Sequence, residues 1–143
     1  MTGQLDFKPL ADAIGALGDA LDVLGDAAWF DAQPRRVRTT LISGAVQSVE
    51  FVYELSIKSI RRSLERYFDD DASVDALSFR ALIRSAAERG LLDDVEAWFG
   101  YREMRNITAR TYDQAKAHKV LASAPAFLTH ARDLHRRLSA LRD

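Results

Sequence analysis

The sequence predicts an all-α, antiparallel (up-and-down) bundle of about five helices, and three observations support this fold class. Apolar residues recur at steps of three and four in nearly every segment, which is the spacing of one helix face. No segment alternates strictly between apolar and polar residues, and no Asn-Gly or Asp-Gly pair marks a hairpin turn. The connections between amphipathic segments are short, so we expect antiparallel neighbours within a single domain spanning residues 1–143.

The first half of the chain predicts two helices. The first has Pro9 in its first turn, where a missing N–H costs nothing, and a connector over 26–34 follows it. Its apolar stripe consists of Phe7, Leu10, Ile14, Leu17, Leu21 and Leu24. The second helix is predicted over 36–68, and apolar positions cover about half of its circumference. We therefore expect it to form the centre of the bundle and to end at the acidic run 69–71.

The second half of the chain predicts three further helices. One runs from Ser78, a favourable N-cap, to Gly90, a favourable residue just beyond a helix end. The next begins with Asp93 and Glu96, which have the spacing of a capping pair. The last is predicted to begin after Pro125. Its apolar stripe consists of Phe127, Ala131, Leu134, Leu138 and Leu141.

Composition excludes several classes of site. The sequence has no cysteine, which excludes disulfides, a thiolate nucleophile and Cys-ligated metal centres. The three histidines, His118, His130 and His135, fit no metal-ligand spacing, so we expect solvated or capping side chains and no metal or other cofactor. The formal net charge is −1, so any basic patch must be local. No apolar run approaches the roughly 20 residues that span a bilayer, and the first residues lack the features of a signal peptide. We therefore expect a cytoplasmic protein.

One stretch carries a recognisable motif, Met104-Arg105-Asn106-Ile107-Thr108-Ala109-Arg110-Thr111-Tyr112-Asp113. It resembles the signature of the HEPN superfamily, in which Arg-Asn opens a segment of the form Arg, four residues, His, one residue, Tyr. Further similar runs precede it in the same order. They are Gln47-Ser48-Val49-Glu50-Phe51, Tyr53-Glu54-Leu55, Lys58, Ser78-Phe79-Arg80, Gly90-Leu91-Leu92-Asp93-Asp94 and Trp98. The similarity covers residues 37–142 and is greatest to the nucleotidyltransferase substrate-binding protein family.

The resemblance implies a helical bundle that forms a homodimer and pairs with a separate minimal nucleotidyltransferase. In the toxin–antitoxin members, the helical subunit is a metal-independent ribonuclease whose Arg and His do the chemistry. The partner silences it, in some systems by attaching nucleotide to the motif tyrosine. In the substrate-binding branch, the helical subunit supplies part of the nucleotide or substrate site.

The sequence departs from the signature at its histidine position, which is Arg110 here. Metal-free RNA cleavage needs a side chain that exchanges a proton near neutral pH, as imidazole does. A guanidinium group stays protonated, with a pKa above about 12, so Arg110 cannot take that role. It can still bind phosphate through its planar set of donors. We therefore predict a non-catalytic binding subunit with weak or no ribonuclease activity.

The resemblance also assigns roles to residues of the motif. Arg105 is the first candidate for contact with nucleotide or RNA. Asn106, Arg110 and Arg102 are candidates to extend that contact, and Tyr112 is the candidate for modification. Arg105 and Tyr112 share one helix face if the helix is continuous across the motif.

Glu50, Glu54 and Lys58 are spaced four residues apart along one predicted helix. They are either an ordinary surface ladder of charged residues or supporting residues that position Arg105. Two alternatives to a binding subunit also stay open: a ribonuclease toxin neutralised by its nucleotidyltransferase partner, and a structural helical protein with a decayed motif. RNA cleavage distinguishes the first alternative, and nucleotide affinity that is lost in Arg105→Ala argues against the second.

Overall fold

The computed structural model describes residues 6–67, 74–110 and 113–141, with side chains described for all of these except 108–110. Every regular element in these ranges is helical, so the predicted all-α bundle is confirmed. The elements are α1 (Lys8–Gly25), α2 (Ala27–Asp31), α3 (Arg35–Leu64), the 3₁₀ turn η1 (Glu65–Tyr67), α5 (Phe79–Glu88), α6 (Val95–Arg110) and α7 (Gln114–Ala140). None of the helices in the described ranges is long and apolar enough to cross a membrane.

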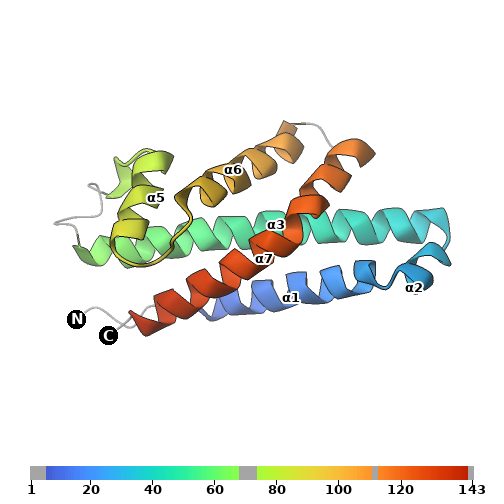
Figure 1. Cartoon of the computed structure of the whole chain (residues 1–143), viewed down its shortest axis with the longest axis horizontal. Helices are drawn as coiled ribbons and strands as arrows, with labels where there is room; N and C mark the ends of the chain where they lie inside the picture. Colours follow the sequence, from blue (N-terminus) through green and yellow to red (C-terminus); the bar gives the residue numbers. More distant parts are fainter. Residues whose placement is uncertain (1–5, 68–73, 111–112, 142–143) are drawn as a thin grey trace.

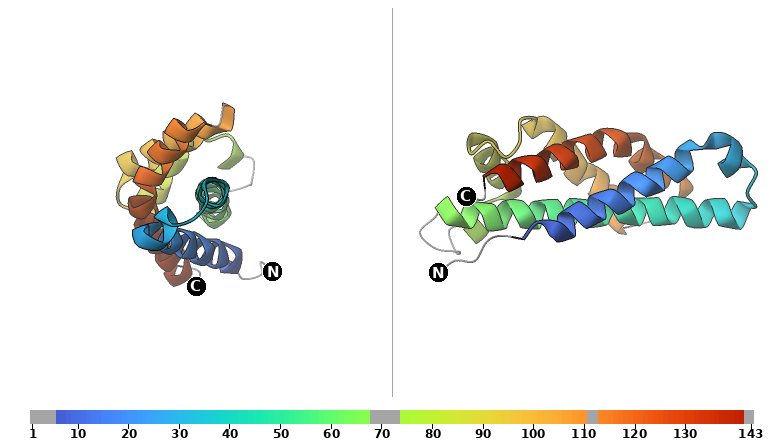
Figure 2. Two further views of the ribbon diagram at one scale, coloured as in Figure 1. Left: turned by 90° about the vertical axis from the view of Figure 1, so that its right-hand side faces the viewer. Right: turned by 90° about the horizontal axis from the view of Figure 1, so that it is seen from below.

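Helix α3 forms the long axis of the molecule, and the other long helices alternate in direction along it (Figure 1). Helix α1 leads from one end to the other, α3 returns, α6 leads away again, and α7 returns to the end where α1 begins. Helices α1 and α7 both pack along α3, as the two views in Figure 2 also show. Helix α6 packs against α3 and α7, and α5 packs against α3 and α6.

The two longest predicted stripes form the core. In α1, Pro9 lies in the first turn, and Leu10, Ile14 and Leu17 are buried. In α3, buried positions recur at steps of three and four along most of the helix. They are Ile42, Ala45, Val46, Val49, Val52, Tyr53, Ser56, Ser59, Ile60, Ser63 and Leu64. Such a wide buried face fits a central helix with neighbours on several sides, as predicted.

The first half of the chain differs from the prediction in two details. The connector 26–34 contains the short helix α2, whose N-cap Asp26 accepts a hydrogen bond from the backbone N–H of Trp29 at 3.3 Å. Helix α3 ends at Leu64, and η1 follows it. The predicted end near residue 68 and the acidic run 69–71 lie outside the described residues.

The third predicted helix is confirmed as α5. Ser78 caps its start, where the hydroxyl accepts a hydrogen bond from the backbone N–H of Ala81 at 3.1 Å. Gly90 follows its end with a φ of 81°, in the left-handed region that favours glycine. The backbone N–H groups of Gly90 and Leu91 donate to the carbonyls of Ala87 and Ala86, which are the two bonds of a Schellman motif.

The predicted starts of the last two helices are wrong. Helix α6 is capped by Asp94, whose carboxylate accepts from the N–H of Ala97 at 2.9 Å, while Asp93 is ion-paired with Arg137 instead. Helix α7 begins at Gln114 and contains Pro125 in its interior.

A proline inside a helix removes one backbone hydrogen bond and costs about 3 kcal/mol, which is why the sequence predicts a helix boundary at Pro125. Two local features offset this cost. The N-cap carboxylate of Asp113 accepts from the N–H of Lys116 at 2.8 Å. The apolar stripe continues before the proline, with Ala117, Val120 and Ala124 buried. Packing of this face therefore extends the helix through Pro125.

An aromatic cluster fixes α6 against α7. The rings of Trp98 and Tyr101 pack edge-to-face at 5.5 Å, and Phe127 lies 4.9 Å from Tyr101 and 6.1 Å from Trp98. Edge-to-face pairs at these separations contribute about 0.5–1.5 kcal/mol each beyond the burial of their surface. With this face of α6 turned to α7, Arg102, Arg105 and Asn106 are directed toward α3 and α5.

Candidate functional site

The motif arginine lies against the central helix. Helix α6 is continuous from Val95 through Arg105 to Arg110. A guanidinium nitrogen of Arg105 lies 3.0 Å from a carboxylate oxygen of Glu54 on α3, and 35% of the arginine side chain is exposed. The structure therefore brings together two of the residues that the sequence singled out, although they lie 51 positions apart in the chain.

A second carboxylate faces the same guanidinium. Glu50 lies one turn before Glu54 on α3, and its pKa is raised. Burial is the main cause; the Arg105 guanidinium opposes it, and the nearby Glu54 carboxylate adds to it. Tyr53 packs beside them and is buried, which raises its pKa to about 12 although Arg102 and Arg105 oppose the shift. Arg105 thus lies next to two acidic side chains on one strip of α3.

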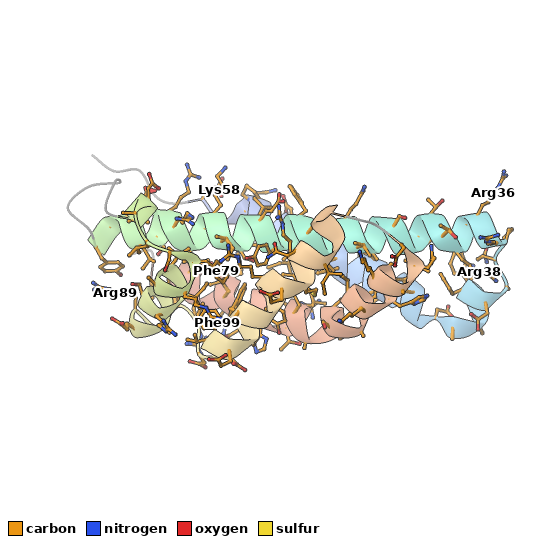
Figure 3. All side chains as sticks on the ribbon, turned by 90° about the horizontal axis from the view of Figure 1, so that it is seen from above. Arg36, Arg38, Lys58, Phe79, Arg89 and Phe99 are labelled. Carbon is orange, nitrogen blue, oxygen red and sulfur yellow. The ribbon has the colours of Figure 1, made fainter. Side chains whose placement is uncertain are left out.

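Arg102 and Asn106 face α5 instead. The guanidinium carbon of Arg102 lies 4.5 Å from the ring centre of Phe79 at the start of α5. Arg102 and Asn106 both line a cleft of about 220 Å³ between α5 and α6. The other residues that line it are Phe79, Arg80, Phe99 and Glu103. Figure 3 shows Phe79 and Phe99 at this junction of the two helices.

A broad hollow of about 600 Å³ lies along the middle of α3, next to the Arg105–Glu54 pair. It is lined by Gly44, Gln47, Ser48, Glu50, Phe51 and Glu54. Phe51 is 57% exposed, the largest exposed fraction among the large apolar side chains of the described residues. An aromatic ring beside a charged pair offers both an apolar and a polar contact to a ligand or a partner.

Lys58 does not join this group. It lines a separate cleft with Asp6 and Pro9 near the start of α1. Figure 3 shows Lys58 on the edge of α3 away from Phe79 and Phe99. Of the three charged residues spaced along α3, the structure therefore brings Glu50 and Glu54 near Arg105 and leaves Lys58 elsewhere.

Two motif residues lie partly or wholly outside the described part of the structure. Arg110 is the last residue of α6, and its side chain lies outside the described part of the structure. Tyr112 lies outside the described residues altogether, so the expectation that it shares a face with Arg105 stays a prediction.

The histidines show one departure from expectation. His118 is exposed, but His130 is half-buried, and its Nδ1 is hydrogen-bonded to the hydroxyl of Tyr101. The two rings lie 5.5 Å apart, so His130 completes the aromatic contact between α6 and α7 and is not simply solvated. Within the described residues, no group of His, Cys, Asp and Glu side chains has the geometry of a metal site.

Comparison with known proteins identifies the family. A family model described as "Nucleotidyltransferase substrate binding protein like" matches residues 5–140. The chain belongs to this family. The membership confirms the resemblance found in the sequence, and it covers both the Arg105 motif and the long central helix.

Two matches come from Haemophilus influenzae, one among curated proteins and one among solved structures. One, called probable ribonuclease HepT, is 42% identical over 128 residues, which cover 90% of this chain and 88% of that protein. The other is a solved structure, described as revealing the fold of a substrate-binding domain of a nucleotidyltransferase. It is 40% identical with a TM-score of 0.88, and the match covers 94% of this chain and 99% of that one.

A Thermus thermophilus protein of solved structure has the same fold at lower similarity. It is 22% identical with a TM-score of 0.59, and the match covers 85% of this chain and 98% of that one. At this identity the likeness supports the helical fold alone.

Proposed function

We propose that this family member is a nucleotide- or RNA-binding subunit without catalytic activity of its own, which pairs with a separate minimal nucleotidyltransferase. The observation that carries the proposal is the ion pair between Arg105 and Glu54 beside the hollow on α3. The carboxylate holds the guanidinium in one orientation, while 35% of the arginine side chain stays exposed. An oriented and accessible guanidinium suits the recognition of a phosphate.

The absence of catalysis follows from the residue at position 110. A ribonuclease that uses no metal needs a side chain that takes or gives a proton near neutral pH. Arg110 occupies the position of the signature histidine, and its guanidinium stays protonated. We propose that Arg110 instead contributes positive charge to the same nucleotide or RNA site.

We further propose that the chain is a homodimer. The support is the hollow on α3, where Phe51 is 57% exposed at a surface that no other described helix covers. Phe51→Ser should weaken such a dimer and leave the helical content unchanged. The measurement is molar mass by light scattering on the eluting protein over a range of concentrations, and a monomer at every concentration of the wild type contradicts this proposal.

The binding proposal is tested by titrating ATP into the purified protein in a calorimeter. Arg105→Ala should abolish measurable binding. Glu54→Gln should strengthen binding, because the amide oxygen still accepts a hydrogen bond from Arg105 while one negative charge beside the phosphate is removed. Lys58→Gln is the matched control, since Lys58 is a charged residue of the same helix that lies away from Arg105. Equal affinity of Arg105→Ala and wild type would contradict the proposal.

The partner is tested by purifying the tagged protein from its native cells, where we propose that it works in the cytoplasm. Recovery of a small nucleotidyltransferase supports the pairing, and its absence from the purified material counts against it. Incubation of the recovered pair with ATP, followed by peptide mass analysis, tests our proposal that Tyr112 accepts nucleotide. A Tyr112→Phe variant is the control for the site.

A second candidate function is a ribonuclease toxin held in check by its nucleotidyltransferase. It is favoured by one observation, the 42% identity to a protein called probable ribonuclease HepT. Hydrolysis of RNA by the isolated wild-type chain, lost in Arg105→Ala, would establish this second function. No hydrolysis together with ATP binding supports the binding subunit.

A further inference from the structure

We infer that the cleft between α5 and α6 is a binding site for the phosphate backbone of single-stranded RNA, a surface that extends the Arg105 site. This inference rests on the proposed function and specifies its substrate class. It is carried by a group of arginines and phenylalanines that the motif itself does not include.

Two guanidinium groups of the cleft, those of Arg80 and Arg102, and that of the neighbouring Arg84 stack on two aromatic rings. The rings of Phe79 and Phe99 lie 6.2 Å apart at an angle of 56°. The guanidinium carbon of Arg80 lies 4.2 Å from the centre of the Phe99 ring, and that of Arg84 lies 5.6 Å from it. Arg102 lies 4.5 Å from the centre of the Phe79 ring. Stacking on a ring holds each guanidinium in place without using its N–H donors.

The positive charge of this group is not neutralised by close ion pairs. Among the described residues, no carboxylate lies within ion-pair distance of Arg80, Arg84 or Arg102, whereas Arg105 and Arg137 are both ion-paired. Glu103 is the one acidic side chain that lines the cleft. Three neighbouring cations around one carboxylate leave a net positive surface, which attracts an anion.

The start of α5 adds to this attraction. Phe79 is the first residue of this ten-residue helix, and Ser78 caps it. The backbone N–H groups at a helix start carry a partial positive charge that favours phosphate. Phe79 also lines the cleft, so the helix start and the arginines act on the same space.

The geometry favours the RNA backbone over the bases. Base recognition by aromatic residues requires an open ring face on which a base can stack. Here Arg80 and Arg84 already lie over Phe99, and Arg102 lies over Phe79. The groups left to meet a ligand are N–H donors, which recognise phosphate in any sequence.

The cleft is also continuous with the motif. Asn106 and Arg102 line it, and Arg105 lies on the neighbouring α3 side of the same helix. An extended polyanion can follow α6 from the cleft to Arg105. The phosphates of a single nucleotide bound at Arg105 have no need of Arg80.

The test measures binding of a fluorescently labelled oligouridylate to the full chain by anisotropy at several salt concentrations. On a single strand, each phosphate contact steepens the fall of log affinity with log salt concentration by about 0.7. Such a contact therefore strengthens binding about fivefold when the salt concentration is lowered from about 1 M to about 0.1 M. Arg80→Gln should therefore weaken binding about fivefold and reduce the slope by about 0.7. The double variant with Arg84→Gln should weaken it about 25-fold. Glu103→Gln should strengthen it.

Two controls separate charge from folding. Arg36→Gln removes an exposed arginine at the far end of α3 and should leave the affinity unchanged (Figure 3). Arg80→Lys keeps the charge and should keep the salt slope of the wild type. Thermal melting of each variant should match the wild type, because Arg80 and Arg84 are exposed.

The outcomes also separate this inference from the proposed function. If Arg80→Gln binds the oligonucleotide like the wild type while Arg105→Ala loses ATP binding, the cleft inference is wrong and the proposed function stands. If Arg80→Gln weakens ATP binding as much as oligonucleotide binding, the cleft takes nucleotide phosphates and the RNA inference is wrong. If the wild type binds neither ligand, both are wrong.

Discussion

Arg137 joins the end of α7 to the connection between α5 and α6, and replacing it with methionine should destabilise the protein. Its guanidinium donates to the carbonyl of Gly90 at 3.1 Å and to Asp133 at 2.8 Å, and it is also ion-paired with Asp93. The Arg137 side chain is 22% exposed. Methionine keeps most of the apolar stem of arginine, so Arg137→Met tests the polar contacts alone.

The expected cost follows from the exposure of each contact. The Asp93 side chain is 76% exposed, so this pair contributes at most about 1 kcal/mol. The half-buried Asp133 and the Gly90 carbonyl each contribute about 0.5–1 kcal/mol after the same screening is applied. The sum is roughly 2 kcal/mol. A chain of this length loses about 3 °C of melting temperature per kcal/mol, so we expect a decrease of about 6 °C.

The assay is thermal unfolding followed by circular dichroism at neutral pH. Arg136→Met is the matched control, because Arg136 neighbours Arg137 but among the described residues is ion-paired only with Asp133, and it is 69% exposed. It should lower the melting temperature by less than about 2 °C. If Arg137→Met changes the melting temperature no more than Arg136→Met does, the three contacts of Arg137 do not stabilise the connection.

The difference between the wild type and Arg137→Met should also depend on pH. Burial alone would raise the pKa of Asp133, but Arg136 and Arg137 outweigh it and hold the pKa below its ordinary value of 3.8. A carboxylate with a lowered pKa in the folded state contributes stability above its unfolded pKa and loses it as the pH falls through the folded pKa. The difference in melting temperature should therefore be full at pH 7 and decrease below about pH 4.

Three further predictions concern the fold. Gly90→Ala should lower the free energy of unfolding, measured in urea, by about 1 kcal/mol. No atom lies near the added Cβ, but the φ of 81° at this position strains any residue that has a side chain. An unchanged free energy of unfolding would show that the turn relaxes. Stability should fall as the pH rises from about 10 to about 12, because burial raises the pKa of Tyr53 and Tyr101 to about 12 and the folded state then holds protons that the unfolded state has lost. Flat stability over that range, with tyrosine absorbance titrating near 10, would contradict it. Pro125→Ala should raise the free energy of unfolding by about 1 kcal/mol, since Pro125 lies inside α7 and provides no N–H donor. A lower free energy of unfolding in this variant would show that the helix needs the proline at this point.

The sequence predicts the fold well because apolar periodicity is a local signal. The stripes of α1 and α3 lie within single segments, and burial follows them closely. Helix starts are harder to predict, since they depend on contacts elsewhere. Asp93 and Asp94 are equally good caps from the sequence, and the choice between them is made by Arg137, which lies 44 positions away and pairs with Asp93. The prediction of a helix start at Pro125 fails for a similar reason, because packing along α7 outweighs the unfavourable effect of a proline inside a helix.

The candidate site is only partly readable from the sequence. The family resemblance allows Glu50, Glu54 and Lys58 equally as residues that position Arg105, and the structure has Glu54 3.0 Å from Arg105. Only the rotation of α3 shows that Lys58 faces another way. Arg102 is a candidate from the sequence, and Arg80 belongs to a run that carries the family resemblance, but their stacking on Phe79 and Phe99 has no local signal because the partners come from different helices. Contacts between distant segments require the three-dimensional arrangement.

The arrangement of residues around α6 also bears on the size of the ligand. Successive residues of a helix point about 100° apart, so Arg105 and Asn106 cannot face the same small pocket although they are adjacent in the motif. Accordingly Arg105 meets Glu54 on α3, while Asn106 joins Arg102 in the cleft beside α5. A compact ligand would contact only one of these faces of α6, and either Arg105 or Asn106 would then have no role in binding. A strand that crosses α6 engages both, so the affinity for oligouridylates should rise with length until the strand reaches from the cleft to Arg105 and then level off.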